Sequence, residues 1–285
     1  MTINDIPCFI TSHGRPNACK TANTLLKNDY KGTIYIVLDN EDSTAEEYKK
    51  LYENVVIFNK DEYVAKFNSF LTQPLRNIVA HARNAVEDIA PQLGYKQWIV
   101  CDDDITSIKL YTYSANENKI VKERVPNLND ILVAYAEYLQ EAKITTIGLG
   151  TENFWLGGQT TMFEEPSHNH YRLCSNIFLR NSINKVEWFP DMFEDIGSAV
   201  HEGRKGNVLM SLPWLSTTAA VQGGKKSSSD SGMSTTYLQL GNYGVSIFPV
   251  CALPDCYHVT GTKLWFACKD YKTTVPKIIS NKYKC

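Results

Sequence analysis

Three consecutive aspartates, Asp102, Asp103 and Asp104, follow the apolar run WIVC in the stretch YKQWIVCDDDI. Like charges at the end of an apolar strand repel one another unless they lie in water or share a cation. Because side chains alternate along a strand, we expect Asp102 and Asp104 to share one side and Asp103 to face the other. Mg²⁺ and Mn²⁺ prefer such oxygen ligands, often one or two carboxylates together with substrate phosphates. The spacing favours a metal site, and a solvated turn or helix cap is the alternative.

Two arginines could bind an anion beside these aspartates. Arg15 lies in the turn TSHGRP, and Arg83 lies in the helix-like stretch HARN. A guanidinium group offers planar, bidentate donors that suit a diphosphate or a base. Arg83 follows Val79 by one helical turn on the flank of an apolar stripe, so a solvated helix arginine is the alternative.

The first hundred residues alternate between strand-like and helix-like segments, which must position these groups. We expect strands at 6–12, 33–39, 54–59 and 97–102, and helices at 18–28, 43–52 and 74–90. Pro74 at the start and Pro91 just past the end delimit the last of these helices. This order predicts an α/β fold with a mostly parallel sheet flanked by helices. Ligands of such sheets bind at the carboxyl ends of the strands, where residues 12–15, 39–42 and 102–104 are nearly all polar.

Beyond residue 105 the alternation ends. We expect a hairpin from 107–114 and 119–125, a helix at 128–142, strands at 144–150 and 171–181, and a helix at 193–206 that stops at Gly203 or Gly206. Residues 222–236, rich in glycine and serine, are expected to be a mobile loop. We interpret the chain as one domain: an N-terminal half at 1–105, a smaller mixed part at 106–221, and a C-terminal extension at 237–285.

Composition limits the functional classes. A net charge of -2 argues against a global attraction to nucleic acid, although residues 269–285 form a basic tail that is either a frayed terminus or a phosphate-contacting arm. The eight cysteines lack zinc-type spacing and predict free or buried thiols in a reducing compartment. Without a signal-like N-terminus or an apolar run of about 20 residues, the protein is expected to be cytoplasmic and not membrane-bound.

The order FITSHGRP, VLDNED, HARNAV, WIVCDDDI, SNIFLRNS and FPDMFEDIGSAVHEGRKG resembles the GT-A fold glycosyltransferases over roughly residues 6 to 206. The resemblance implies transfer from a nucleotide-sugar donor with Mn²⁺ or Mg²⁺ as cofactor. It implies Asp102 and Asp104 as metal ligands and Asp103 near the donor ribose. It further implies a donor site lined by Ser12, Arg15, Asp39 and Arg83.

The pair Glu194-Asp195 resembles the acidic motif that supplies the general base of inverting members. The resemblance implies Asp195 as the base and Glu194 as the alternate, and a helix N-terminus favours an ionised carboxylate there. An acidic helix cap is the alternative. A late histidine often completes the metal site of this family, which implies His258, with His168 and His170 as competitors.

The opening IPCFITSHGRP, the DDD run and the chain length are similar to the TET-associated glycosyltransferases, which include phage enzymes that act on 5-hydroxymethylcytosine in DNA. This similarity implies a UDP-sugar donor and duplex DNA as partners, in the host cytoplasm if a phage encodes the protein. The acceptor base would have to leave the stack. Trp155 is then a candidate stacking platform for the acceptor, or a core residue. Lys225 and Lys226 would contact phosphates.

Three other functions compatible with the sequence remain open. The same chemistry could act on a glycan, a lipid precursor or a protein side chain. The chain could be a non-catalytic module that binds a nucleotide sugar or DNA, because fold does not guarantee chemistry. A nucleotidyltransferase shares the order of elements, but TSHGRP is a poor version of its glycine-rich phosphate loop.

Overall fold

The computed structural model of the protein describes residues 1–151, 175–220, 232–257, 259–263 and 269–273. Its central feature is a nine-stranded sheet in the order β3-β2-β1-β4-β8-β7-β9-β5-β6. A separate two-stranded sheet pairs β10 (Val259–Lys263) with β11 (Lys269–Thr273). Within the described ranges, no helix is both long and apolar enough to cross a membrane.

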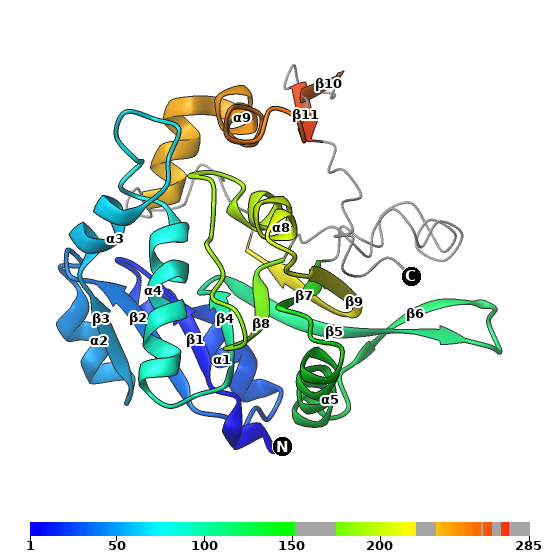
Figure 1. Ribbon diagram of the computed structural model, residues 1–285. Helices are drawn as coiled ribbons and strands as arrows, with labels where there is room; N and C mark the ends of the chain where they lie inside the picture. The colour runs from blue at the N-terminus through cyan, green and yellow to red at the C-terminus, as the bar shows by residue number, and fades with distance from the viewer. Residues whose placement is uncertain (152–174, 221–231, 258, 264–268, 274–285) are drawn as a thin grey trace.

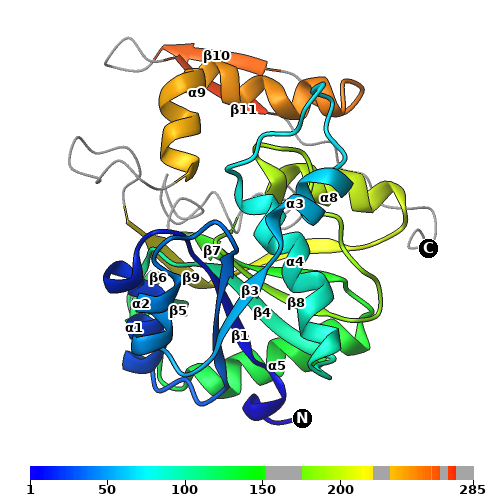
Figure 2. The ribbon, with the colours of Figure 1, turned by 90° about the vertical axis from the view of Figure 1, so that its left-hand side faces the viewer.

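The N-terminal third forms the alternating α/β unit that the sequence predicted. Its elements are β1 (Cys8–Thr11), α1 (Lys20–Lys27), β2 (Ile34–Asp39), α2 (Ala45–Leu51), β3 (Val55–Phe58), α3 (Lys60–Lys66), α4 (Val79–Gln92) and β4 (Gln97–Asp102). The neighbours β3, β2, β1 and β4 all run parallel. Parallel neighbours need crossover connections, and the intervening helices supply them (Figures 1 and 2).

The remaining strands continue the same sheet with mixed direction. They are β5 (Ile105–Ser114), β6 (Lys119–Arg124), β7 (Thr146–Thr151), β8 (Ile177–Asn181) and β9 (Leu209–Ala219), with α5 (Leu128–Glu141) and α8 (Glu194–Arg204) between them. Of the eight neighbouring pairs, four are antiparallel: β4 with β8, β8 with β7, β9 with β5, and β5 with β6. The prediction of a mostly parallel sheet was therefore wrong beyond β4, because a hairpin and the reversed strand β8 complete the sheet.

Two boundaries also differ from the prediction. Helix α4 begins at Val79 rather than Pro74, and Pro91 lies in its last turn rather than past its end. In the segment before α4, the buried carboxylate of Asp191 accepts hydrogen bonds from Ser69 Oγ at 2.7 Å and from the Leu75 backbone N–H at 2.9 Å. These bonds tie the segment to Asp191.

The predicted loop at 222–236 is only partly described. Its residues 232–236 belong instead to α9 (Gly232–Ala252), which bends at Gly241, where φ is +64°. Residues 222–231 lie outside the described part of the chain. The prediction of a loop is therefore wrong for the last five residues of that segment.

Two apolar clusters lie on opposite faces of the sheet. Side chains from Cys8, Ile10 and Leu38 face α1, α2 and α5, whereas their neighbours Phe9 and Val37 face α4. This alternation follows from the period-two geometry of strands.

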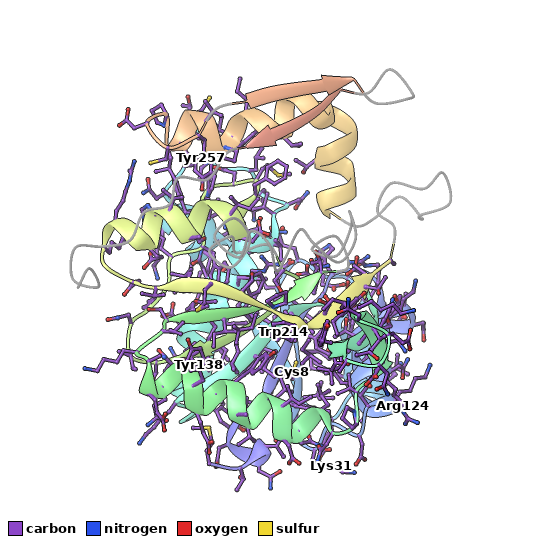
Figure 3. The ribbon with its side chains drawn as sticks, turned by 90° about the vertical axis from the view of Figure 1, so that its right-hand side faces the viewer. Cys8, Lys31, Arg124, Tyr138, Trp214 and Tyr257 are labelled. Carbon is purple, nitrogen blue, oxygen red and sulfur yellow. The ribbon has the colours of Figure 1, made fainter. Side chains whose placement is uncertain are left out.

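The five described cysteines are free thiols, as predicted. The sulfur atoms of Cys8, labelled in Figure 3, and Cys101 lie 3.4 Å apart.

A third apolar cluster joins the C-terminal part to α8. It combines Ile196 and Val200 of α8 with Leu253 and Tyr257. Tyr257, labelled in Figure 3, donates a hydrogen bond of 2.8 Å from its hydroxyl to the Ile196 carbonyl. Part of the C-terminal extension thereby packs on the helix that begins with Glu194.

Candidate active site

Three polar strand ends meet at one edge of the sheet. Strand β1 pairs with β2 on one side and with β4 on the other, and Thr11 lies opposite both Val37 and Asp102. The loops that begin at Ser12, Asp39 and Asp102 are therefore neighbours, although they are far apart in sequence (Figure 2). This arrangement is the one expected for ligand sites of open parallel sheets.

The aspartate run forms the turn between β4 and β5. Strand β4 ends at Asp102, so strand alternation extends only that far, and Asp103 and Asp104 lie in a tight turn. Thr21, fully buried in the first turn of α1, fixes this turn. Its hydroxyl donates to the Asp102 carbonyl at 2.6 Å and accepts from the Ile105 N–H at 2.9 Å, and its own N–H donates to the Asp103 carbonyl at 3.1 Å.

Asp103 points toward the first-strand turn. Its carboxylate accepts a short hydrogen bond from Ser12 Oγ and an ion-pair contact of 2.7 Å from Arg15 Nη2. Burial raises the pKa of Asp103, and Arg15 and Ser12 oppose that shift. The Tyr48 hydroxyl lies 2.7 Å from Ser12 Oγ and accepts from the Arg15 N–H at 2.9 Å. The Arg15 side chain is held at Nη2 by Asp103 and is 37% exposed.

Asp39 belongs to a second charged group at the end of β2. Its carboxylate lies 2.8 Å from His13 Nδ1 and 3.6 Å from Lys60 Nζ. Burial raises the pKa of Asp39, but His13 and Lys60 outweigh it and hold this pKa below its usual value. The same hydrogen bond raises the pKa of His13. Gly14 adopts a φ of +69° here, which favours glycine, and its N–H donates to Asp42 at 2.9 Å.

Arg83 connects the aspartate turn to the acidic helix start. Its Nη2 lies 2.8 Å from Asp102 Oδ1, and its Nη1 forms a short ion pair with Glu194 Oε1. The guanidinium carbon lies 4.6 Å from the centre of the Phe178 ring, and the side chain is 2% exposed. The alternative of a solvated helix arginine is therefore excluded, whereas a contact between Arg83 and the donor stays a prediction.

Glu194 and Asp195 occupy the first turn of α8. Helix α8 begins and ends close to the prediction, with Gly206 at φ +88° just past its end. Glu194 is buried, and burial raises its pKa to about 7 despite the neighbouring Arg83 charge. Asp195 is only half-buried, and its Oδ1 accepts from the Ile196 N–H at 2.8 Å. The two carboxylates thus differ in burial: Glu194 is buried in an ion pair with Arg83, and Asp195 is half-buried.

Asp104 has a carboxylate oxygen that nothing in the described ranges compensates. Its Oδ1 atom is buried and has no hydrogen-bond partner within the described part of the chain. Burial, followed by the charges of Asp102 and Asp103, raises the pKa of Asp104 to about 6. An orphaned carboxylate oxygen beside two other carboxylates is what a divalent cation would satisfy. The residues present therefore fit a metal ion.

A second group with ligand chemistry lies elsewhere. Glu187, His201 and Glu202 place one potential ligand atom each within 4.8 Å of the others. Lys205 Nζ already lies 3.1 Å from Glu187 and 2.8 Å from Glu202, and His201, with Lys205, lowers the pKa of Glu187 to about 2. This group is a network of ion pairs and hydrogen bonds with Lys205 at the end of α8.

Several predicted site residues fall outside the described part of the chain. They are Trp155, Lys225, Lys226 and His258, together with the competing His168 and His170. The sequence placed His13 in the polar strand end 12–15 but gave it no role, and it missed Thr21 and Tyr48. Nothing in the sequence pairs Thr21 or Tyr48 with the aspartates.

The chain matches the family model described as TET-Associated Glycosyltransferase over residues 6–221. It belongs to that family. The match spans all three polar strand ends, the aspartate turn and the Glu194-Asp195 pair, whereas the candidates Lys225, Lys226 and His258 lie beyond it. None of the curated proteins matches the chain. Family membership makes the protein a glycosyltransferase, an enzyme of the transferase class.

Proposed function

We propose that this TET-associated glycosyltransferase uses a GT-A type, metal-dependent mechanism to transfer a sugar from a UDP-sugar. The acceptor in this proposal is the hydroxymethyl group of 5-hydroxymethylcytosine in phage DNA, and the anomeric configuration is inverted. The observation that carries the metal and donor part is the aspartate turn, with the buried, unpaired Asp104 Oδ1 beside Asp102. Family membership supports the choice of acceptor.

Asp102 and Asp104 would hold Mn²⁺ or Mg²⁺, which when bound stabilises negative charge on the departing diphosphate. Arg15 supplies a fixed cation with an exposed edge for the same phosphates, because Asp103 and Tyr48 hold its other side. Ser12 and Asp39 line the nucleoside side of the site. Preorganised charges of this kind lower the barrier without rearrangement during the reaction.

Asp195 is the general base in this mechanism. It takes the proton of the acceptor hydroxyl while the hydroxyl oxygen bonds to the anomeric carbon, and the bond from that carbon to the diphosphate oxygen breaks with its electron pair leaving on the diphosphate. Glu194 does not serve as well, because its carboxylate is engaged by Arg83. Instead, Glu194 and Arg83 fix the start of α8 relative to Asp102.

Transfer to a glycan, lipid precursor or protein side chain is the second candidate. The net charge of -2 favours it, because an acidic protein gains no general attraction to DNA. The donor and metal chemistry would be the same, so acceptor assays distinguish the two candidates.

Donor hydrolysis by the full-length chain tests the metal and donor assignments. UDP-sugar breakdown should require Mn²⁺ or Mg²⁺, stop with EDTA, and fall about 100-fold or more in Asp104→Asn, since a loss of several kcal/mol is expected. Asp29→Asn is the matched control, because Asp29 is 76% exposed and has a φ of +59° that asparagine accepts. Full activity in EDTA or in Asp104→Asn would refute the assignment.

A further inference from the structure

The β5-β6 hairpin projects from the sheet as a two-stranded ribbon (Figure 1). Strand β5 pairs with β9 only from Ile105 to Leu110, and with β6 from Lys109 to Ser114. At about 3.3 Å per residue, the ten residues of β5 extend roughly 30 Å, close to one turn of B-form DNA. The ribbon starts directly after Asp104, so it leads away from the aspartate turn itself.

Cross-strand register sorts the ribbon's side chains into two faces. Directly opposed residues share a face, and successive pairs alternate between faces. One face carries the pairs Lys109 with Arg124, Tyr111 with Lys122, and Tyr113 with Ile120. We call it the basic face. The other face carries the pairs Leu110 with Glu123, Thr112 with Val121, and Ser114 with Lys119.

The charges are segregated between these faces. Across the six pairs, three of the four cations lie on the basic face and the only carboxylate lies on the other. Lys119, the remaining cation, forms a short ion pair with Glu117 at the ribbon tip. Leu110 packs against the apolar cluster beneath α1 and α5, so the basic face points away from that cluster. On the basic face Tyr111 is only 8% exposed, whereas Arg124 and Tyr113 are exposed. Charged residues on edge strands commonly prevent association between sheets. That role does not require all charges on one face to be positive.

We infer that the basic face of the β5-β6 ribbon binds the phosphate backbone of duplex DNA and presents that DNA to the active site. Lysine and arginine supply the sequence-independent contacts to phosphate, and a two-stranded ribbon fits the major groove. Arg124, labelled in Figure 3, and Tyr113 are exposed, the latter by 56%. Tyrosine interleaved with cations adds contacts to sugar and base.

Position supports this inference. Lys109 is five residues from Asp104, roughly 17 Å along an extended strand and about half a turn of B-form DNA. Duplex DNA that delivers an unstacked base to the aspartate turn would therefore extend over Lys109 and Arg124. The inference rests on the proposed DNA acceptor, but it concerns binding alone and needs neither donor nor metal.

The test compares duplex binding by full-length variants. Fluorescence anisotropy with unmodified duplex DNA is measured as a function of salt for wild type, Lys109→Gln/Arg124→Gln and Lys27→Gln/Lys119→Gln. The control pair removes the same charge at exposed lysines outside the basic face. We expect the basic-face variant to bind about tenfold more weakly, with a salt slope reduced by about two, and the control to match wild type.

Three results would overturn the inference: no duplex binding by wild type, an unchanged basic-face variant, or an equal loss in the control. Equal thermal midpoints for the three proteins establish that folding is not the cause. Donor hydrolysis by wild type separates this failure from failure of the proposed function. If the protein hydrolyses UDP-sugar with metal but binds no duplex, the DNA-binding role of the ribbon and the DNA acceptor are refuted. The donor and metal assignments then stand.

Discussion

Replacing Arg83 with methionine should destabilise the protein strongly. The substitution keeps the approximate length of the side chain but removes the cation between Asp102 and Glu194. Glu194 is then a buried carboxylate without its ion pair, and the contact of the guanidinium with Phe178 is also lost. Breaking a buried pair by removing one partner costs about 3–5 kcal/mol.

The thermal shift follows from the size of the chain. An unfolding entropy of about 2.1 cal/mol/K per residue gives about 0.6 kcal/mol/K for 285 residues. A loss of 3–5 kcal/mol should therefore lower the thermal midpoint by about 5–8 °C. The second variant, Arg83→Met/Glu194→Gln, removes the stranded charge and should recover more than half of the loss.

Urea unfolding and calorimetry at neutral pH measure both variants. Raising the pH above neutral should widen the gap between Arg83→Met and wild type, because the pKa of Glu194, about 7 beside Arg83, rises further when that cation is removed. An Arg83→Met protein within 1 kcal/mol of wild type would refute the buried ion pair. So would a double variant that is less stable than Arg83→Met alone.

Three further results are expected. Thr21→Val should cost about 2 kcal/mol in urea unfolding, because it strands the Asp102 carbonyl and the Ile105 N–H, whereas Thr24→Val, which loses one bond, should cost about 1 kcal/mol. Equal costs would contradict the role of Thr21. Below about pH 6, Mn²⁺ affinity measured by calorimetry should fall up to tenfold for each unit of pH, because a proton competes with the cation for Asp104, whose pKa is raised. Asp104→Asn should flatten that pH dependence. Asp195→Asn should lower kcat by about 10²–10⁴. Glu194→Gln should lower stability, because Glu194 forms the buried ion pair with Arg83, and should lower kcat less; a larger loss of kcat in Glu194→Gln than in Asp195→Asn would make Glu194 the base.

The sequence predicted the parallel part of the fold because each early strand is followed by an amphipathic helix. It did not predict where β8 lies. Periodicity reports which side chains of 177–181 are buried, but not that this strand enters between β4 and β7 in the opposite direction. Pairing partners distant in sequence leave no local signal.

The candidate site was predictable to the extent that it consists of strand ends. Asp39 and Asp102 could be placed at one edge from the order of elements alone. The network around them could not, because Thr21 meets Asp102 across 81 positions and Arg83 meets Glu194 across 111. The position of Arg83 on the flank of an apolar stripe predicts a solvated side chain. Its burial depends on the carboxylates of Asp102 and Glu194, which only the fold brings next to it.

Nucleoside mass spectrometry of treated DNA tests the proposed function most directly. Duplex DNA with 5-hydroxymethylcytosine, and the same duplex with cytosine, is incubated with the protein, Mn²⁺ and a panel of UDP-sugars, then digested to nucleosides. The predicted result is a gain of one pentose or hexose mass on 5-hydroxymethylcytosine alone, abolished by EDTA and by Asp104→Asn. No mass gain with any donor, in a preparation that hydrolyses UDP-sugar, would contradict the DNA acceptor and direct attention to glycan, lipid or protein acceptors.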